Sequence, residues 1–308
     1  MNTENKIPYY SLNNYLKDTF SMKVYKVSVD GGFTCPNRDG KIDTRGCIFC
    51  SAGGSGEFAQ SRSMSITEQI NAGKKLILNK LPKNKPFGLI AYFQAFTNTY
   101  ADIRTLTAKY EEAINHPEVV AVSIATRPDC INEEIVALLS KLNKKKPIWV
   151  ELGLQTIHEE TAKYIRRGYS LDVFEKAVSM LKRAEVEIIT HVILGLPKES
   201  KNQMLETVEY VGKSGSTGIK LQLLHVLKET DLEKEYITGN FEVLSEQDYV
   251  NLVCDSVKLL PPHMVIHRMT GDGDKKLLVA PLWSADKKHV INELSKYLYP
   301  VSKNETNS

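Results

Sequence analysis

Short apolar segments recur along the chain and alternate with segments whose apolar residues follow a helical period. The apolar segments are rich in β-branched and aromatic residues. Several are apolar at nearly every position, which is typical of parallel strands covered on both faces. We therefore predict six strands, at residues 24–29, 87–94, 119–126, 148–155, 187–195 and 218–226.

The segments between these strands carry helix signals. Ser65 with Glu68, and Ser200 with Gln203, have the spacing of capping boxes, and the first of these helices is expected to end near Leu81. A further helix is expected between residues 101 and 116. Apolar residues at i, i+3, i+4 and i+7 predict two more helices, around Ile135, Leu138, Leu139 and Leu142 and around Phe174, Ala177, Val178 and Leu181.

Six β–α units thus occupy about residues 24–237. Right-handed crossovers convert such units into either a barrel-like sheet or an open, doubly wound one, and the pattern leaves both open. No GxGxxG follows a predicted strand, which counts against a dinucleotide-binding fold. We read residues 1–23 as an N-terminal extension, 24–240 as the core, and 241–308 as a C-terminal extension that packs on it, with helices at about 245–260 and 285–298.

Composition adds few constraints. The 308 residues are 42% hydrophobic and 25% charged, which is ordinary for a soluble globular protein. The polar start lacks the apolar segment of a signal peptide, and no apolar run has membrane-spanning length, so we expect a cytoplasmic protein without membrane contact. A net charge of +3 permits an anionic partner without requiring one.

Three of the five cysteines stand close together in a glycine-rich segment, as Cys35, Cys47 and Cys50 in a C-x11-C-x2-C pattern. Thiolates suit zinc or an iron–sulfur cluster. Structural zinc needs a fourth ligand, and its candidates, Cys130, His191 and His225, lie far downstream. A [4Fe–4S] cluster on three thiolates leaves one iron open to an outside ligand. The segment also follows the first predicted strand, where active-site loops of barrels emerge.

This segment resembles the cluster loop of radical S-adenosylmethionine (SAM) enzymes, with a longer gap between the first two cysteines. The resemblance extends over nearly the whole chain and is closest to the YhcC/YtqA-type branch, which is related to the Elongator catalytic-subunit-like group. The segments that carry it are LKDTFSMKVYKVSVDGGFTCPNRDG, ATRPD, ELGLQT, LGLP, IKLQLLHVLKET, RMTGD and APLWS. The resemblance implies an α/β fold, a partial (β/α)6 TIM-like barrel with a C-terminal extension.

In that family the open iron binds SAM, and reductive cleavage gives a 5′-deoxyadenosyl radical that abstracts hydrogen from substrate. The three cysteines match the cluster ligands. The resemblance implies SAM contacts from Phe49, Gln94, Ala95, Phe96, Gln155, Arg167, His191, Leu196 and Pro197. Glu151 joins them because a carboxylate within an apolar strand is costly to bury without a partner. Each also has an ordinary structural interpretation. These are loop packing for Phe49, a polar turn for the segment at Gln94, a structural ion pair for Arg167 and a hydrogen-bonded core histidine for His191.

Polar residues near the expected barrel mouth are candidate substrate contacts or, equally, helix caps and ion pairs: Arg127, Gln222, His225, Arg268 and Asp272. Related groups modify tRNA, so the resemblance implies maturation of a wobble-uridine side chain from carboxymethylaminomethyl to aminomethyl. It also implies reduced flavodoxin or ferredoxin as electron donor and a tRNA methyltransferase acting next. The alternatives are a radical SAM enzyme with a small-molecule or protein substrate, and a zinc-stabilised nucleic-acid-binding module without catalysis.

Overall fold

Eight parallel strands form the main sheet of the computed structural model, which describes residues 9–82, 85–271 and 273–298. Their order is β1-β9-β7-β6-β5-β4-β3-β2, and each neighbouring pair is parallel. The strands are β1 (Tyr10–Ser11), β2 (Lys23–Val29), β3 (Phe87–Phe93), β4 (Val119–Thr126), β5 (Ile148–Gln155), β6 (Glu187–Leu194), β7 (Gly218–Leu223) and β9 (Val265–Arg268).

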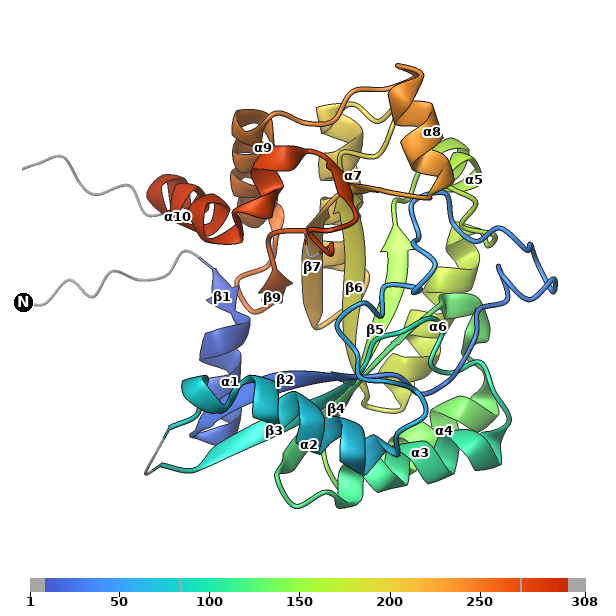
Figure 1. The fold of residues 1–308 in the computed structure, drawn as a ribbon, viewed down its shortest axis with the longest axis vertical. Helices are drawn as coiled ribbons and strands as arrows, with labels where there is room; N and C mark the ends of the chain where they lie inside the picture. The colour runs from blue at the N-terminus through green and yellow to red at the C-terminus, as the bar shows by residue number, and fades with distance from the viewer. Residues whose placement is uncertain (1–8, 83–84, 272, 299–308) are drawn as a thin grey trace, which may run out of the picture.

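Six consecutive strands, β2 to β7, lie side by side in chain order, and this decides between the two architectures left open by the sequence. When each crossover moves one strand in the same direction, all the crossover helices fall on one face of the sheet, whereas a doubly wound sheet reverses direction. The sheet accordingly curls into a partial barrel with helices outside it (Figure 1). The predicted partial (β/α)6 barrel is confirmed.

The six predicted strands are present. The last one is interrupted, because after β7 the chain leaves the sheet and forms β8 (Val226–Leu227), which pairs antiparallel with β10 (Leu278–Ala280). The strand prediction missed β1, β9 and β10, which are two to four residues long and carry little periodic signal. β9 follows residue 240 yet pairs with β7, so the C-terminal part of the chain completes the main sheet. The domain boundaries stay a prediction.

The helices alternate with the strands as predicted, and both predicted capping boxes form, at Ser65 and at Ser200. No helix in the described part of the chain is long and apolar enough to cross a membrane. The helices are α1 (Leu12–Phe20), α2 (Ile66–Leu76), α3 (Ile103–Asn115), α4 (Glu133–Asn143), α5 (Glu159–Tyr164), α6 (Leu171–Arg183), α7 (Lys201–Lys213), α8 (Asp231–Ile237), α9 (Glu246–Leu259) and α10 (Lys287–Leu298), with short 3-10 turns at Leu78–Lys80, Pro128–Cys130 and Leu282–Ala285.

The sheet is apolar on both faces, but the two faces pack differently. The large core lies between its outer face and the surrounding helices. On the inner face a smaller cluster fills one end of the barrel, and we call it the floor layer: Leu16, Ile90, Ala121, Trp149 and Ile189. Leu16 comes from α1, so this helix closes the barrel at that end. The floor layer confines any interior cavity to the opposite end.

Candidate active site

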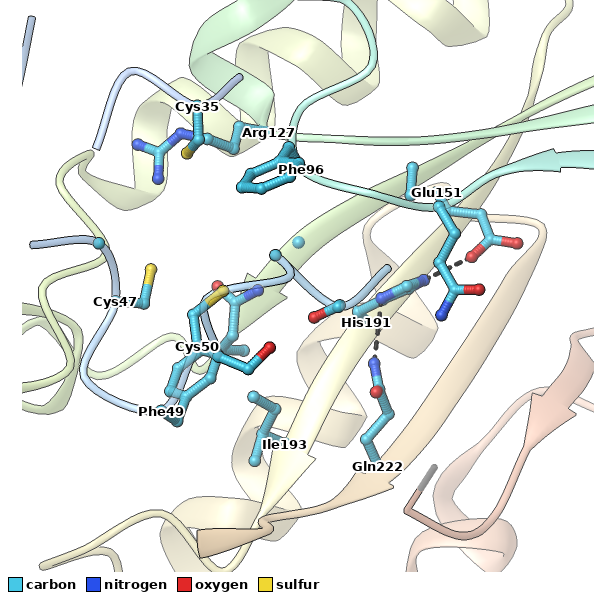
Figure 2. A pocket seen from close by; sticks show the side chains of 18 of the residues that line it. Cys35, Cys47, Phe49, Cys50, Phe96, Arg127, Glu151, His191, Ile193 and Gln222 are labelled. Carbon is cyan, nitrogen blue, oxygen red and sulfur yellow. Dashed lines mark hydrogen bonds and ion pairs between the residues drawn. The ribbon is translucent and has the colours of Figure 1, made fainter. Parts of the chain in front are cut away.

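A cavity of about 260 Å³ opens at the carboxyl ends of the barrel strands. Its lining comes from the loop after β2 and from the ends of β3 to β7, which is where barrels carry their active sites. Figure 2 shows the three cysteines at one end and Glu151, His191 and Gln222 at the other. The structure brings together fourteen of the residues singled out in the sequence: Cys35, Cys47, Phe49, Cys50, Gln94, Phe96, Arg127, Glu151, Gln155, Arg167, His191, Gln222, His225 and Arg268.

The cysteines lie on irregular backbone between β2 and α2, and hydrogen bonds hold this loop in place. Asn37, which is buried, donates from Nδ2 to the Arg166 carbonyl at 2.7 Å and to the Cys47 Sγ at 3.5 Å. Arg38 donates to the carbonyl of Cys50 at 2.9 Å. Gly54 has φ +59, and a Cβ there would lie 2.5 Å from the Phe96 ring, so the loop requires glycine at this position.

The chemistry of the three thiols fits an iron–sulfur cluster. None is in a disulfide, and burial raises the pKa of Cys47 to about 11, so its thiolate needs a cation to stabilise it. Among residues 9–82, 85–271 and 273–298, no three His, Cys, Asp or Glu side chains converge closely enough to hold one metal ion. A four-iron cluster does not require the three thiols to converge on one ion, because each thiolate binds a separate iron.

The segment after β3 borders the cysteine loop. Gln94 and Phe96 line the cavity, and the Phe96 ring stacks near Arg38 and Arg62, whose guanidinium carbons lie 5.8 and 5.5 Å from its centre. Ala95 is buried behind them and is not among the residues that line the cavity. Phe96 has φ 60, a conformation that non-glycine residues adopt rarely and often at functional sites.

Gln155 and Arg167 lie together at the end of β5. The register of β5 against β6 shifts between Gly153 and Gln155, and Gln155 has φ 65, so a bulge re-aims its side chain. The Arg167 side chain is 1% exposed. Its guanidinium already donates to backbone carbonyls of Tyr169, Leu154 and Thr156, and to Glu159 at 3.1 Å. A two-point contact with a ligand carboxylate would require some of these bonds to break, and the contact stays a prediction.

Five interacting polar side chains cross the barrel next to the floor layer, and we call them the charged layer: Lys26, Ser123, Glu151, His191 and Lys220. Glu151, fully buried, is their common partner. Its Oε1 accepts from Lys26 at 2.9 Å and from Ser123 at 2.6 Å, and its Oε2 accepts from His191 at 2.8 Å and from Lys220. Gln222 in turn lies 3.0 Å from the His191 Nδ1.

The charged layer fixes the ionisation of its members. Burial alone would raise the pKa of Glu151, but the charges of Lys220 and Lys26 outweigh burial, so this pKa lies well below its ordinary value. Burial, assisted by the charge of Lys220, lowers the pKa of His191 to about 4. Glu151 is therefore an anion and His191 is neutral at pH 7, which makes Nε2–H of His191 the donor to Glu151 and its Nδ1 the acceptor from Gln222.

The remaining predicted residues vary in their placement. Arg127 pairs with Asp129 through two hydrogen bonds of 2.9 and 2.8 Å, and His225 accepts from the Gly273 backbone at 3.2 Å. Leu196 and Pro197 are buried, but neither is among the residues lining the cavity, and Leu196 packs in an apolar cluster behind it. Asp272 falls outside the described residues.

Sequence reasoning missed Lys26 and Lys220, which supply the charges opposite Glu151. A signal was present. Each of the charged residues Lys26, Glu151 and Lys220 stands in an apolar segment that was predicted to be a buried strand. A buried charge requires an opposite charge nearby. The three segments together therefore pointed to one ion-pair network inside the barrel. Tyr92 is also buried at 4% exposure, and its hydroxyl lies 3.3 Å from the Lys220 Nζ.

Comparison with protein-family models decides the family. Residues 44–211 match the model of the radical SAM superfamily, and residues 216–299 match the model of the radical SAM C-terminal domain. The chain belongs to the radical SAM superfamily. Members of this superfamily bind a [4Fe–4S] cluster and SAM, which counts against the zinc-stabilised module considered from the sequence and leaves the alternative of a small-molecule or protein substrate open. Cys35 precedes the matched range, in keeping with the enlarged first gap of the cysteine motif.

Several known proteins are similar to this radical SAM chain. YtqA of Bacillus subtilis is 44% identical over 96% of this chain and 91% of its own length, and YhcC of Escherichia coli K12 is 32% identical over 91% and 88%. A tRNA uridine(34) acetyltransferase of Methanocaldococcus infernus is 26% identical over 53% of this chain and 30% of its own length. The structure of Elp3 from M. infernus shares the fold, with a TM-score of 0.66 at 19% identity over 90% of this chain and 64% of that one.

Proposed function

We propose that this radical SAM enzyme modifies the side chain of a tRNA wobble uridine, converting a carboxymethylaminomethyl group to an aminomethyl group. The N–CH2 group would lose two electrons to SAM, which would leave as methionine and 5′-deoxyadenosine, and water would hydrolyse the resulting imine to the amine and glyoxylate. The observation that carries the proposal is the similarity of the chain to a tRNA uridine(34) acetyltransferase. The barrel also has a cavity at the carboxyl ends of its strands. The similarity covers only 30% of the length of that acetyltransferase, so we infer a shared tRNA target and not acetyl transfer.

We propose that Cys35, Cys47 and Cys50 hold the cluster and leave one iron for SAM. When bound, the two supply a reactive 5′-deoxyadenosyl group that abstracts a hydrogen atom. The chain's own residues orient and shield it. Phe49 and Phe96 offer apolar faces to the adenosyl group, and Gln94 and Gln155 offer amide donors and acceptors beside them. Reduced flavodoxin or ferredoxin would supply the electron.

Basic and aromatic side chains on and beside the cysteine loop are suited to RNA. Arg38 and Arg62 stack near Phe96, and the Lys41 Nζ lies 5.2 Å from the centre of the Tyr100 ring. RNA loops are commonly bound by aromatic stacking combined with phosphate contacts, and a base that undergoes chemistry is turned out of its stack into a pocket. A wobble base inserted here would enter between the cysteine loop and the segment after β3.

The proposal is tested by nucleoside analysis of tRNA from a strain that lacks the gene. We expect carboxymethylaminomethyluridine to accumulate and the aminomethyl form, with the methylated product of the next enzyme, to disappear. The wild-type gene and a Cys254→Ala variant should restore the profile, because Cys254 lies in α9 and does not line the cavity, whereas Cys47→Ala should not. An unchanged wobble nucleoside profile would refute the tRNA proposal and leave family membership intact.

A further inference from the structure

The charged layer contains two amines and one carboxylate. Lys26 and Lys220 both contact Glu151, and His191 is neutral. Burial lowers the pKa of Lys220 to about 7, so a bound anion would favour its protonated form. The side chains of Lys220 and Glu151 are 3% and 0% exposed.

An excess charge at such depth is costly, because a buried ion loses its hydration. On β4, β5 and β6 an apolar floor-layer side chain lies two residues before the charged layer, whereas the corresponding residue on β7 is Gly218. A surplus ammonium group is compatible with a stable barrel when a ligand supplies the missing negative charge.

Lys220 is placed to meet such a ligand. It lines the cavity, and its ammonium group has three donors, of which Glu151 and the Tyr92 hydroxyl account for two. Gln222 lies two residues further along β7 on the same face of the sheet and also lines the cavity. Its amide nitrogen has a second hydrogen in addition to the one directed at His191.

We propose that Lys220 and Gln222 form a carboxylate-binding subsite, which holds the acid group of the substrate side chain at the end of the cavity opposite the cysteines. This inference rests on the proposed function and names what the cavity recognises: the carboxylate of an N-carboxymethyl amine. The anchored carboxylate places its neighbouring CH2 group between the subsite and the cysteine end. Glu151 holds Lys220 in place and is a positioning residue.

The ligand side of the subsite is tested with two free nucleosides that differ in one charge, 5-carboxymethylaminomethyluridine and its neutral carboxamide. Binding is measured by calorimetry to the full chain loaded with its cluster and SAM. We expect the carboxylate to bind about ten- to hundredfold more tightly, the range of a charge-assisted hydrogen bond, and added salt to reduce the difference. Equal affinities, or no binding of either nucleoside, would overturn the subsite.

The protein side is tested with Lys220→Met, which leaves Lys26 and Glu151 as a one-to-one pair. We expect this variant to lose the preference for the carboxylate and to bind the carboxamide as the wild type does. Lys163→Met is the matched control, because Lys163 is an exposed lysine paired with Glu160. If Lys220→Met weakens both nucleosides equally, or keeps the preference, Lys220 is a structural partner of Glu151 and the subsite is wrong.

The result is separable from that of the tRNA experiment. A wild-type preference for the carboxylate together with an unchanged tRNA profile in the deletion strain would refute the proposed function and retain the subsite. Loss of the wobble modification in the deletion strain together with equal nucleoside affinities would refute the subsite and retain the proposed function. Thermal unfolding of Lys220→Met shows whether the variant is folded, and the comparison of the two nucleosides on the wild type does not depend on it.

Discussion

Two neighbouring layers of the barrel interior differ in character although largely the same strands build both. The floor layer is apolar, and on β4, β5 and β6 the charged layer begins two residues further along the strand. The steps are from Ala121 to Ser123, Trp149 to Glu151 and Ile189 to His191. Since side chains two apart on a strand share a face, both layers point into the barrel. The difference teaches that one layer closes the barrel and the adjacent layer supplies polar side chains to the cavity.

The largest expected effect comes from removing the shared carboxylate of the charged layer. Glu151→Ala leaves the buried Lys220 and the half-buried Lys26 without their partner, so we expect the free energy of unfolding to fall by about 3–5 kcal/mol in urea denaturation. Glu160→Ala, which removes the exposed partner of Lys163, is the control and should change little. Similar losses in the two variants would mean that the charged layer is not a buried ion-pair network.

A change in the floor layer should reduce stability and spare the cavity. Leu16→Ala removes a buried side chain that α1 inserts into the barrel, so we expect a loss of about 3 kcal/mol in the free energy of unfolding. The affinity for SAM, measured by calorimetry on the cluster-loaded chain, should stay at the wild-type value. A large loss of SAM affinity would show that the two layers are coupled.

The charged layer should also make stability depend on pH through His191. Its pKa is about 4 in the folded protein and 6.5 in the unfolded chain, so between these values the unfolded chain binds more protons. Stability is therefore retained above pH 6.5 and lost on acidification toward pH 4, by up to about 1.4 kcal/mol per pH unit from this group. His191→Gln should flatten this part of the profile, whereas His289→Gln, at an exposed site, should not.

The smallest effect is expected at the polar edge of the floor layer. The Tyr15 hydroxyl donates to Glu187 at 2.5 Å while its ring packs edge-on against Trp149. Tyr15→Phe keeps the ring and removes the hydrogen bond, so we expect a loss of about 1 kcal/mol in the free energy of unfolding. A loss as large as that of Leu16→Ala would mean that the floor layer depends on a polar contact and is less distinct from the charged layer.

The sequence predicted the six core strands because parallel strands covered on both faces are apolar throughout. It could not predict β1 or β9, since elements of two and four residues have no measurable period and gain their stability from pairing. The candidate cysteine site could be predicted because its three thiols are close in the sequence. The contacts within the charged layer were not predicted. Lys26, Glu151 and Lys220 come from three separate strands, and only the curled sheet brings them together.

All three cysteines lie outside the helices and strands, in the loop between β2 and α2. β2 is a terminal strand of the sheet order, hydrogen-bonded to β3. The sheet hydrogen bonds and the floor layer therefore involve none of the thiols. This gives maturation a natural order: the polypeptide can fold first, and a cluster-assembly machinery can then deliver iron and sulfide to a loop that is already held open on a finished scaffold.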